Sequence, residues 1–342
     1  MQTKGRTLMS KEKTDKTEKK EQHITSIGGQ AVMEGVMMRG PYKTVTAVRK
    51  PDGEITKKID ENGTKTRPKI CKVPIIRGCV SFIDSLVIGM KALMFSAEFV
   101  DIEEEEGEEQ SKFDKWLEDK LGDKIKDIVI YFAVFLSVIF SVALFILLPS
   151  ALSGAVEAIP AFKSFTSTQT FTSVFEGVLR MAIFLGYMFL ISRMKEIKRV
   201  FEYHGAEHKT IACYEGGDEL TVENVRKYTR FHPRCGTSFL LFVMIISIIV
   251  FAFLPRFDGF GGIAAILLRM GTRILCLPVV AGLSFEVIKW AGRSKNHFVG
   301  VLSKPGLWLQ RLTTREPDDS QIEVAIASMI PCIPENKEED RW

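Results

Sequence analysis

The sequence predicts an α-helical multi-pass membrane protein with about four transmembrane helices and a small cytoplasmic β module near its N-terminus. Hydrophobic residues make up 46% of the chain and charged residues 26%, and the two kinds occupy separate stretches. A polar region with short β-type runs comes first, and long runs without a charge follow it. Such segregation is typical of membrane proteins, whose spans exclude charge.

Five parts are expected along the chain. The first, residues 1–27, is polar throughout and has no apolar core, which predicts a disordered leader rather than a cleaved signal peptide. The other parts follow in order: a cytoplasmic β module (28–79), an amphipathic helix with an acidic linker (80–112), a four-span membrane domain (113–291) that contains a cytoplasmic His/Cys loop (193–237), and a cytoplasmic C-terminal tail (292–342).

The β module is predicted from three β-type runs, at 45–49, 55–59 and 70–76. The turn signals Pro51-Asp52-Gly53 and Asn62-Gly63 separate these runs, as in antiparallel hairpins. We therefore expect a small antiparallel sheet.

The segments on either side of these runs leave alternatives open. Residues 27–40 are rich in glycine and methionine, so they either place Glu34 and Arg39 in a binding loop or form turns around a core strand. Residue type alone favours the turns. Residues 80–100 carry apolar side chains at helical spacing, so this helix either lies in the inner membrane interface or packs on the bundle, and packing is favoured.

Four apolar runs are predicted to span the membrane. Residues 128–148 and 238–254 are free of charge and reach the roughly 17–25 residues that cross a bilayer. The run at 178–191 is shorter, and it spans only with neighbouring residues at both ends. The last run, 262–288, is interrupted by arginines; it forms either one tilted span or an outer turn followed by a short span.

Basic residues predict the orientation. The segment 193–237 holds nine lysines and arginines and the tail from Lys289 holds eight, whereas 149–175 and 255–261 hold one each. We expect a protein of the cell (inner) membrane. By the positive-inside rule, both of its termini and the His/Cys loop face the cytoplasm. A net charge of +4 is too small for this length to indicate a nucleic-acid-binding surface. The expected partner is the lipid bilayer, and the sequence identifies no protein partner.

The His/Cys loop contains an H-x-x-E-H pattern formed by His204, Glu207 and His208. On a helix the two histidines lie on one face, where they can share a metal ion, and Glu207 lies beside them as a general base. His232 and Cys235 return to the same membrane face and can complete the ligand set, which suits zinc or another divalent metal.

Two alternatives weigh against a catalytic metal site. If all four residues bind, the site is closed and structural, because catalysis needs one position open to water. Histidines near a membrane also often bond only to backbone carbonyls or to lipid phosphates.

Five separated motifs carry a resemblance to a known family. They lie at 30–39 (QAVMEGVMMR), 203–209 (YHGAEHK), 230–238 (RFHPRCGTS), 286–293 and 310–317 (QRLTTREP). Together they resemble the YqhQ-like family of bacterial membrane proteins, a domain family of unknown function, from about residue 27 to about residue 330. The family's members are commonly labelled metal-dependent enzymes. The resemblance implies that Glu34, Arg39, Arg234 and Arg315 belong to a shared site.

The leading functional prediction is metal-dependent hydrolysis of an unknown substrate at the cytoplasmic membrane surface. His204 and His208 bind the metal, His232 or Cys235 completes the shell, Glu207 is the base, and arginines bind an anionic group. The alternative is a non-catalytic scaffold or regulator with a structural zinc. A transporter is a third reading, motivated by charges near the spans: Arg180, Arg269, Arg273 and Glu286.

Overall fold

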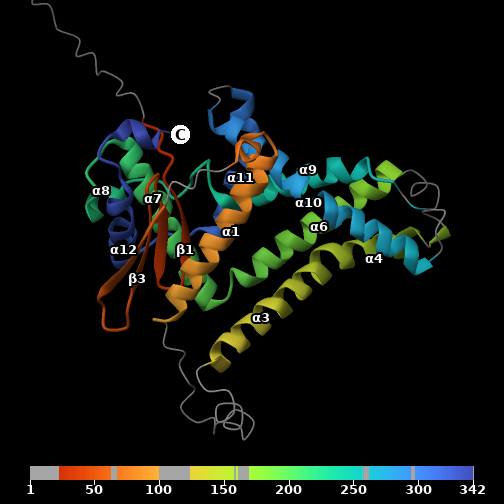
Figure 1. Cartoon of the computed structure of the whole chain (residues 1–342), viewed down its shortest axis with the longest axis horizontal. Helices are drawn as coiled ribbons and strands as arrows, with labels where there is room; N and C mark the ends of the chain where they lie inside the picture. The colour runs from red at the N-terminus through yellow and green to blue at the C-terminus, as the bar shows by residue number, and fades with distance from the viewer. Residues whose placement is uncertain are drawn as a thin grey trace, which may run out of the picture.

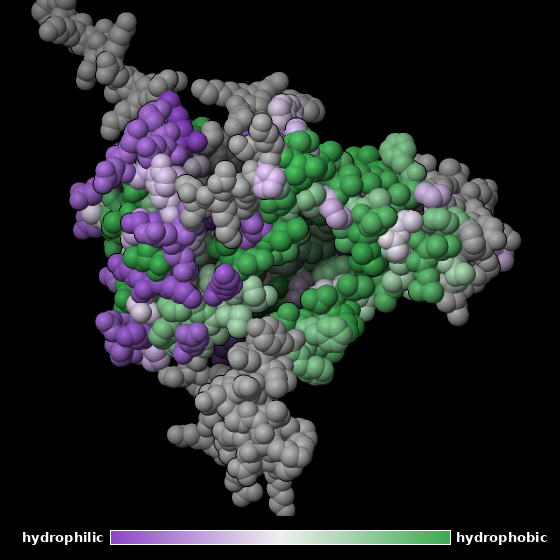
Figure 2. All heavy atoms as spheres, viewed as in Figure 1, coloured by the Kyte–Doolittle hydropathy of each residue, from purple (hydrophilic) through white to green (hydrophobic). Residues whose placement is uncertain are grey.

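The computed structural model describes residues 23–62, 68–99, 124–157, 159–160, 169–255, 257, 262–293 and 297–341. The fold is mostly helical, with a small antiparallel sheet near the N-terminus. Figure 1 shows the sheet with α7, α8 and α12 at one end of the molecule and a bundle of long helices at the other. The surface is hydrophilic over the first part and hydrophobic over the bundle (Figure 2). Most of the predicted leader lies outside the described residues.

The sheet has four consecutive antiparallel strands in the order β1-β2-β3-β4. Their bounds are Gly28–Val32, Gly35–Arg39, Lys43–Arg49 and Ile55–Glu61. The predicted runs at 45–49 and 55–59 therefore lie in β3 and β4. The third predicted run, 70–76, is wrong: Lys69–Lys72 is a 3₁₀ helix, and α1 follows it. Pro68 and Pro74 flank this segment, and proline cannot donate to a strand ladder.

The two faces of the sheet are covered by different helices, because alternate side chains of a strand point to opposite faces. Val36 and Met38 of β2 pack in a core with α7 (Lys195–Gly216) and α12 (Asp319–Met329). Met37, between them, packs with Ala92 of α1 (Ile76–Ala97) on the other face.

The residues predicted as a C-terminal tail are part of this folded body. They form α11 (His297–Thr313), α12 and the short 3₁₀ helices Ile330–Cys332 and Lys337–Asp340. Ile322 and Met329 of α12 are buried against the sheet. Near the end of the chain, Arg341 forms a β-bridge with Thr25.

Four helical segments are long and apolar enough to cross a membrane, namely Ile76–Ala97, Phe132–Val156, Phe171–Ile191 and Leu267–Trp290. The second joins α3 (Lys124–Val142), a π-helical segment η2 (Ala143–Leu147) and α4 (Leu148–Glu157); the third and fourth lie in α6 (Gln169–Ile191) and α10 (Gly262–Arg293). α10 is one continuous helix through residues 262–288, and its candidate span begins at Leu267.

Two helices differ from the predicted set of membrane spans. α1 meets the length and composition of a span, although residues 80–100 were expected to be amphipathic. The predicted span 238–254 corresponds to α9 (Gly236–Ala252), which is apolar but only 17 residues long.

α1 joins the sheet to the bundle. Gly78 lies so close to α10 that a Cβ atom there would be 2.8 Å from the Gly282 Cα, and Gly89 approaches the side chain of Gln30 in β1. Arg77 donates from Nη2 to both carboxylate oxygens of Glu286, at 2.8 and 2.7 Å. Glu286, which the transporter reading had invoked, is thus the ion-pair partner that fixes α1 to α10.

Candidate metal site

Helix α7 carries the histidine motif and is unusually buried for a polar helix. It starts after Met194 and ends at Gly216; the next residue, Gly217, has a φ of 77°, which suits a glycine that follows a helix C-terminus. From Tyr203 to Glu215 most of its residues are buried between the sheet, α12 and the C-terminal segment. Polar side chains buried in this way need defined partners.

His204 and His208 are held in the protonation pattern that metal ligands need. Their rings lie one helical turn apart, with centroids 4.4 Å from each other. The Nδ1 of His204 is 2.9 Å from the carbonyl oxygen of Thr313, and the Nδ1 of His208 is 2.5 Å from that of Arg230. A carbonyl can only accept, so each Nδ1 carries a hydrogen, and each Nε2 is the nitrogen whose lone pair becomes available to a metal when the ring is neutral.

Cys235 supplies the third donor atom. It is the N-cap of α9, and its Sγ lies 3.2 Å from the Nε2 of His204. Burial alone would raise the pKa of this thiol, but the nearby charges of His204 and His208 outweigh burial and hold the pKa well below its usual value. The donor atoms of His204, His208 and Cys235 all lie within 4.8 Å of one another, which allows them to share one ion.

The contact between Cys235 and His204 also shifts the pKa of His204. Burial lowers the pKa of an imidazole, but the charge of the Cys235 thiolate and its hydrogen bond raise the pKa of His204 to about 9. Without a metal, the two side chains therefore form a thiolate–imidazolium pair.

Glu207 lies beside this cluster with one oxygen unsatisfied. It is buried against β1, where a Cβ on Gly29 would be 2.9 Å from its Cγ, and the Gly29 backbone hydrogen-bonds to the carboxylate. Its Oε2 has no hydrogen-bond partner among the described residues. Burial raises the pKa of Glu207, although His204 and His208 partly oppose this shift.

His232 was predicted as a ligand but lies next to the group of three. Its ring centroid is 5.6 Å from that of His208, while its Nε2 is 3.6 Å from Oε2 of Glu215. The amide of Gln310 fixes its backbone by accepting from the N–H at 2.9 Å and donating to the carbonyl at 2.7 Å.

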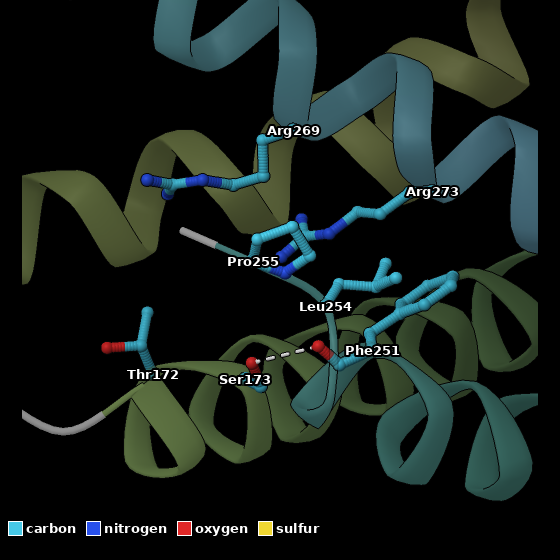
Figure 3. Close-up of a pocket in the computed structure, with 7 residues that line it drawn as sticks. All are labelled: Thr172, Ser173, Phe251, Leu254, Pro255, Arg269 and Arg273. Atoms are coloured by element: carbon cyan, nitrogen blue, oxygen red, sulfur yellow. Dashed lines mark hydrogen bonds between the residues drawn. The ribbon is translucent and has the colours of Figure 1, made fainter. Parts of the chain in front are cut away.

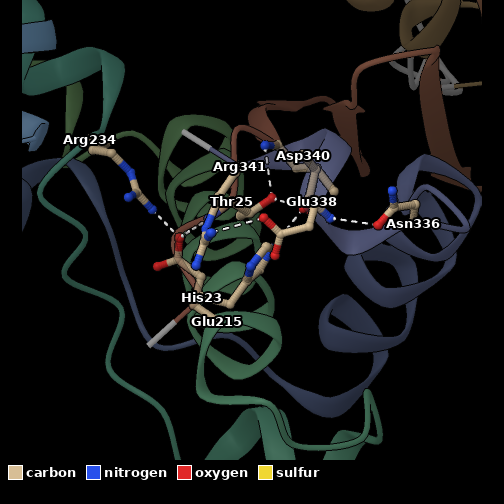
Figure 4. Close-up of polar contacts among 9 residues, drawn as sticks. His23, Thr25, Glu215, Arg234, Asn336, Glu338, Asp340 and Arg341 are labelled. Carbon is tan, nitrogen blue, oxygen red and sulfur yellow. Dashed lines mark hydrogen bonds and ion pairs between the residues drawn. The ribbon is translucent and has the colours of Figure 1, made fainter. Parts of the chain in front are cut away.

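Glu215 connects this region to both ends of the chain (Figure 4). It forms a buried ion pair with Arg234 and accepts from the backbone N–H of Thr25 at 2.9 Å. The hydroxyl of Thr25 donates in turn to Asp340, at 2.6 Å. Arg234 therefore lies close to the histidines, but Glu215 already neutralises it.

In the part of the chain that the structure describes, neither Glu34 nor Arg39 forms a hydrogen bond or ion pair with the three donors, although Glu34 accepts from the hydroxyl of Tyr203, next to His204, at 3.2 Å. Glu34 occupies the β1–β2 turn with a φ of 48° and forms an ion pair with Arg199. Arg39 ends β2, roughly 16 Å along an extended strand from Glu34, and it shares the face of Met37 that α1 covers. Arg315 donates to the carbonyl of Ser192 at 3.0 Å.

Backbone groups near the cluster were not predicted from residue types. The carbonyls of Thr313 and Arg230 orient the histidines, and any residue type offers a carbonyl. Thr313 reaches His204 because the next residues cross α7 at Gly205, where a Cβ would be 2.0 Å from the Arg315 oxygen. The only signal in the sequence was the motif at 310–317.

Comparisons with known proteins agree with the resemblance. The family described as "Protein of unknown function (DUF1385)" matches residues 73–335. The uncharacterized protein YqhQ of Bacillus subtilis (strain 168) is 38% identical over 305 residues, which cover 88% of this chain and 90% of that protein. No solved structure matches.

Proposed function

The chain belongs to the DUF1385 family, whose function is unknown, and we propose that it is a membrane-bound hydrolase that uses a divalent metal held by His204, His208 and Cys235. The observation that carries this proposal is the unpaired Oε2 of Glu207 beside three converging donor atoms. A buried carboxylate oxygen without a partner is costly, so its position here favours a role toward a bound ion or water.

The donor set fits zinc. Two imidazole nitrogens and a thiolate are ligands that zinc prefers, and three protein ligands with one open position are typical of catalytic zinc sites. A closed site with four protein ligands would require His232 to leave Glu215. The carbonyls that fix both imidazoles are the outer partners expected around metal-bound histidine.

The roles of the chain's own residues follow from this arrangement. When bound, the metal would act as a Lewis acid toward the substrate and acidify water. Glu207 accepts a proton through Oε2, while the backbone of Gly29 holds the carboxylate in place. Burial raises the pKa of Glu207 toward the range that favours proton exchange near neutral pH.

The test of catalysis is Glu207→Gln, which keeps the size of the side chain and removes its ability to accept a proton. We expect metal content and protein level close to wild type, and a cellular phenotype equal to that of a full deletion. Glu223→Gln, an exposed site on α8 (Val222–Arg226), is the matched control and should complement the deletion. Complementation by Glu207→Gln at normal protein level would refute hydrolysis.

A structural zinc is the second proposal, favoured by the burial of the cluster and by its place between α7 and the start of α9. In that case the metal fastens the sheet domain to the bundle. Cys235→Ser should then lower the amount of folded protein strongly, whereas Glu207→Gln should be nearly silent in the cell.

A further inference from the structure

A second polar cluster lies inside the helix bundle, far from the His/Cys cluster. Its charged members are Glu176 and Arg180 on α6 and Arg269 and Arg273 on α10. Cys235 caps the start of α9, but this cluster surrounds the other end of that helix, about 24 Å away along its axis. Charged residues within apolar helices are costly and usually serve a function.

The charge of one arginine of the cluster is neutralised by a carboxylate. Arg273 forms an ion pair with Glu176, and the two side chains are only 7% and 2% exposed. Its Nη1 also donates to the hydroxyl of Ser150 on α4, at 2.9 Å. Glu176, the one carboxylate among the described members of the cluster, is thus already paired with this arginine.

Arg180 is held by uncharged groups. Its Nε donates at 2.9 Å to the carbonyl of Phe145, which belongs to the π-helical segment η2. π-Helical turns of this kind are frequent at functional sites. The guanidinium groups of Arg180 and Arg273 each lie 5.6 Å from the centre of the Phe251 ring.

Arg269 has no such compensation. Its Nε is buried and lacks a hydrogen-bond partner among the described residues. Counted over the residues that the structure describes here, the cluster contains three guanidinium groups for one carboxylate, in surroundings where unpaired charge is expensive. An anion would remove this imbalance.

A hollow next to Arg269 offers room for that anion (Figure 3). The hollow is small and partly open to the outside: the centres of water-sized molecules can occupy about 20 Å³ of it. Its lining combines two arginines of α10, two hydroxyl residues near the start of α6 and the apolar end of α9: Arg269, Arg273, Thr172, Ser173, Phe251, Leu254 and Pro255. In Figure 3, Arg269 flanks the hollow from one side, and Thr172 and Ser173 flank it from the other.

We propose that this hollow binds a phosphate group, with Arg269 as its main cationic contact. The planar guanidinium matches phosphate oxygens. The Ser173 hydroxyl donates to the carbonyl of Phe251 at 3.5 Å, and it would exchange this long bond for one to the phosphate. The hollow lies where the candidate span of α6 begins and where α9 ends, and lipid phosphates occur at the ends of membrane-spanning helices. The phosphate can belong to a phospholipid head group or be free inorganic phosphate.

The experiment compares the full-length protein with Arg269→Gln in two arms. The first arm measures phosphatidylglycerol that stays bound through a delipidating detergent wash, by native mass spectrometry. The second measures binding of radiolabelled inorganic phosphate by equilibrium dialysis in detergent. The control is Arg193→Gln, which removes an exposed arginine just beyond the other end of α6.

We expect Arg269→Gln to weaken binding about tenfold or more in one arm, and that arm identifies the source of the phosphate. Arg193→Gln should bind as wild type does. Arg269→Lys, which keeps the charge but loses the fork of donors, should show an intermediate loss and guards against a folding defect in the glutamine variant. Equal binding by wild type and Arg269→Gln in both arms, or an equal loss in Arg193→Gln, would overturn the proposal.

Discussion

At the scale of single residues, Gly205 controls how closely the C-terminal segment approaches the histidine helix. The backbone N–H of Arg315 donates to the carbonyl of Phe201 at 2.9 Å, and this bond draws the segment across α7 at Gly205. A side chain at this position would collide with a backbone oxygen that cannot move without breaking that bond. Thr313, which orients His204, lies two residues before the crossing.

Gly205→Ala should therefore destabilise the protein and loosen the metal site. We expect a loss of about 1–3 kcal/mol or more, because overpacking against fixed backbone is poorly relieved. The thermal midpoint in detergent and the bound metal should both fall. Gly186→Ala, on α6, is the control, since a Cβ there meets no atom within 4 Å. Equal midpoints for the two variants would contradict this account.

The histidines differ in their expected contribution to metal binding. His204→Ala and His208→Ala should each abolish stoichiometric metal, because two remaining ligands rarely hold zinc. His232→Ala should keep most of it, since the Nε2 of His232 lies near Glu215. Elemental analysis of the purified variants is the measurement. If all three variants lose the metal equally, His232 turns toward the ion and the site is closed.

At the scale of elements, the packing of the sheet limits which helices can cross the membrane. β2, α7 and α12 share one core, so they lie on one side of the bilayer. An even number of spans must therefore separate the sheet from α7, and also α7 from α12. We predict that the segment Phe132–Val156 and α6 supply the first pair, so that α1 does not cross although its length and composition are those of a span. The second pair needs α9 as well as α10.

We therefore expect the exposed face of α1 to lie along the membrane surface. Its large apolar side chains recur at helical spacing and are 38–58% exposed: Ile76, Ile83, Leu86, Val87, Met90 and Leu93. Figure 1 shows α1 running across the junction between the sheet and the bundle.

Leu86→Glu should lower the yield of folded protein in membranes, because it places a charge in an apolar layer. Lys91→Glu changes an exposed residue of the same helix and should be tolerated. Fluorescence-detected size exclusion of the detergent extracts measures both. Equal tolerance of the two substitutions would place this face of α1 in water.

At the scale of the whole molecule, basic residues set which side the sheet faces. Reporter fusions after Asp218 and at Trp342 should read cytoplasmic, and a fusion after Ala158 should read external, because lysine and arginine are retained inside. An external signal at Asp218 would reverse the orientation and place the His/Cys cluster outside the cell.

Much of this architecture was predictable because it follows from local composition. The apolar runs in α3, α6 and α10 and the hairpin signals of β3 and β4 each act within a few residues. The third β run failed because Pro68 and Pro74 deny it ladder hydrogen bonds. The C-terminal helices were missed as core, since α12 buries Ile322 and Met329 against a sheet almost 300 residues earlier in the chain.

The candidate site likewise has features that local sequence determines and features that depend on tertiary contacts. The sequence by itself determined that His204, Glu207 and His208 share one helical region, because helical spacing is a local property. Only the tertiary structure decided that Cys235 joins the two histidines and that His232 pairs with Glu215. The physical reason is that backbone carbonyls and close glycine contacts, such as Gly205 against Arg315, orient these side chains, and neither has a signature in residue type.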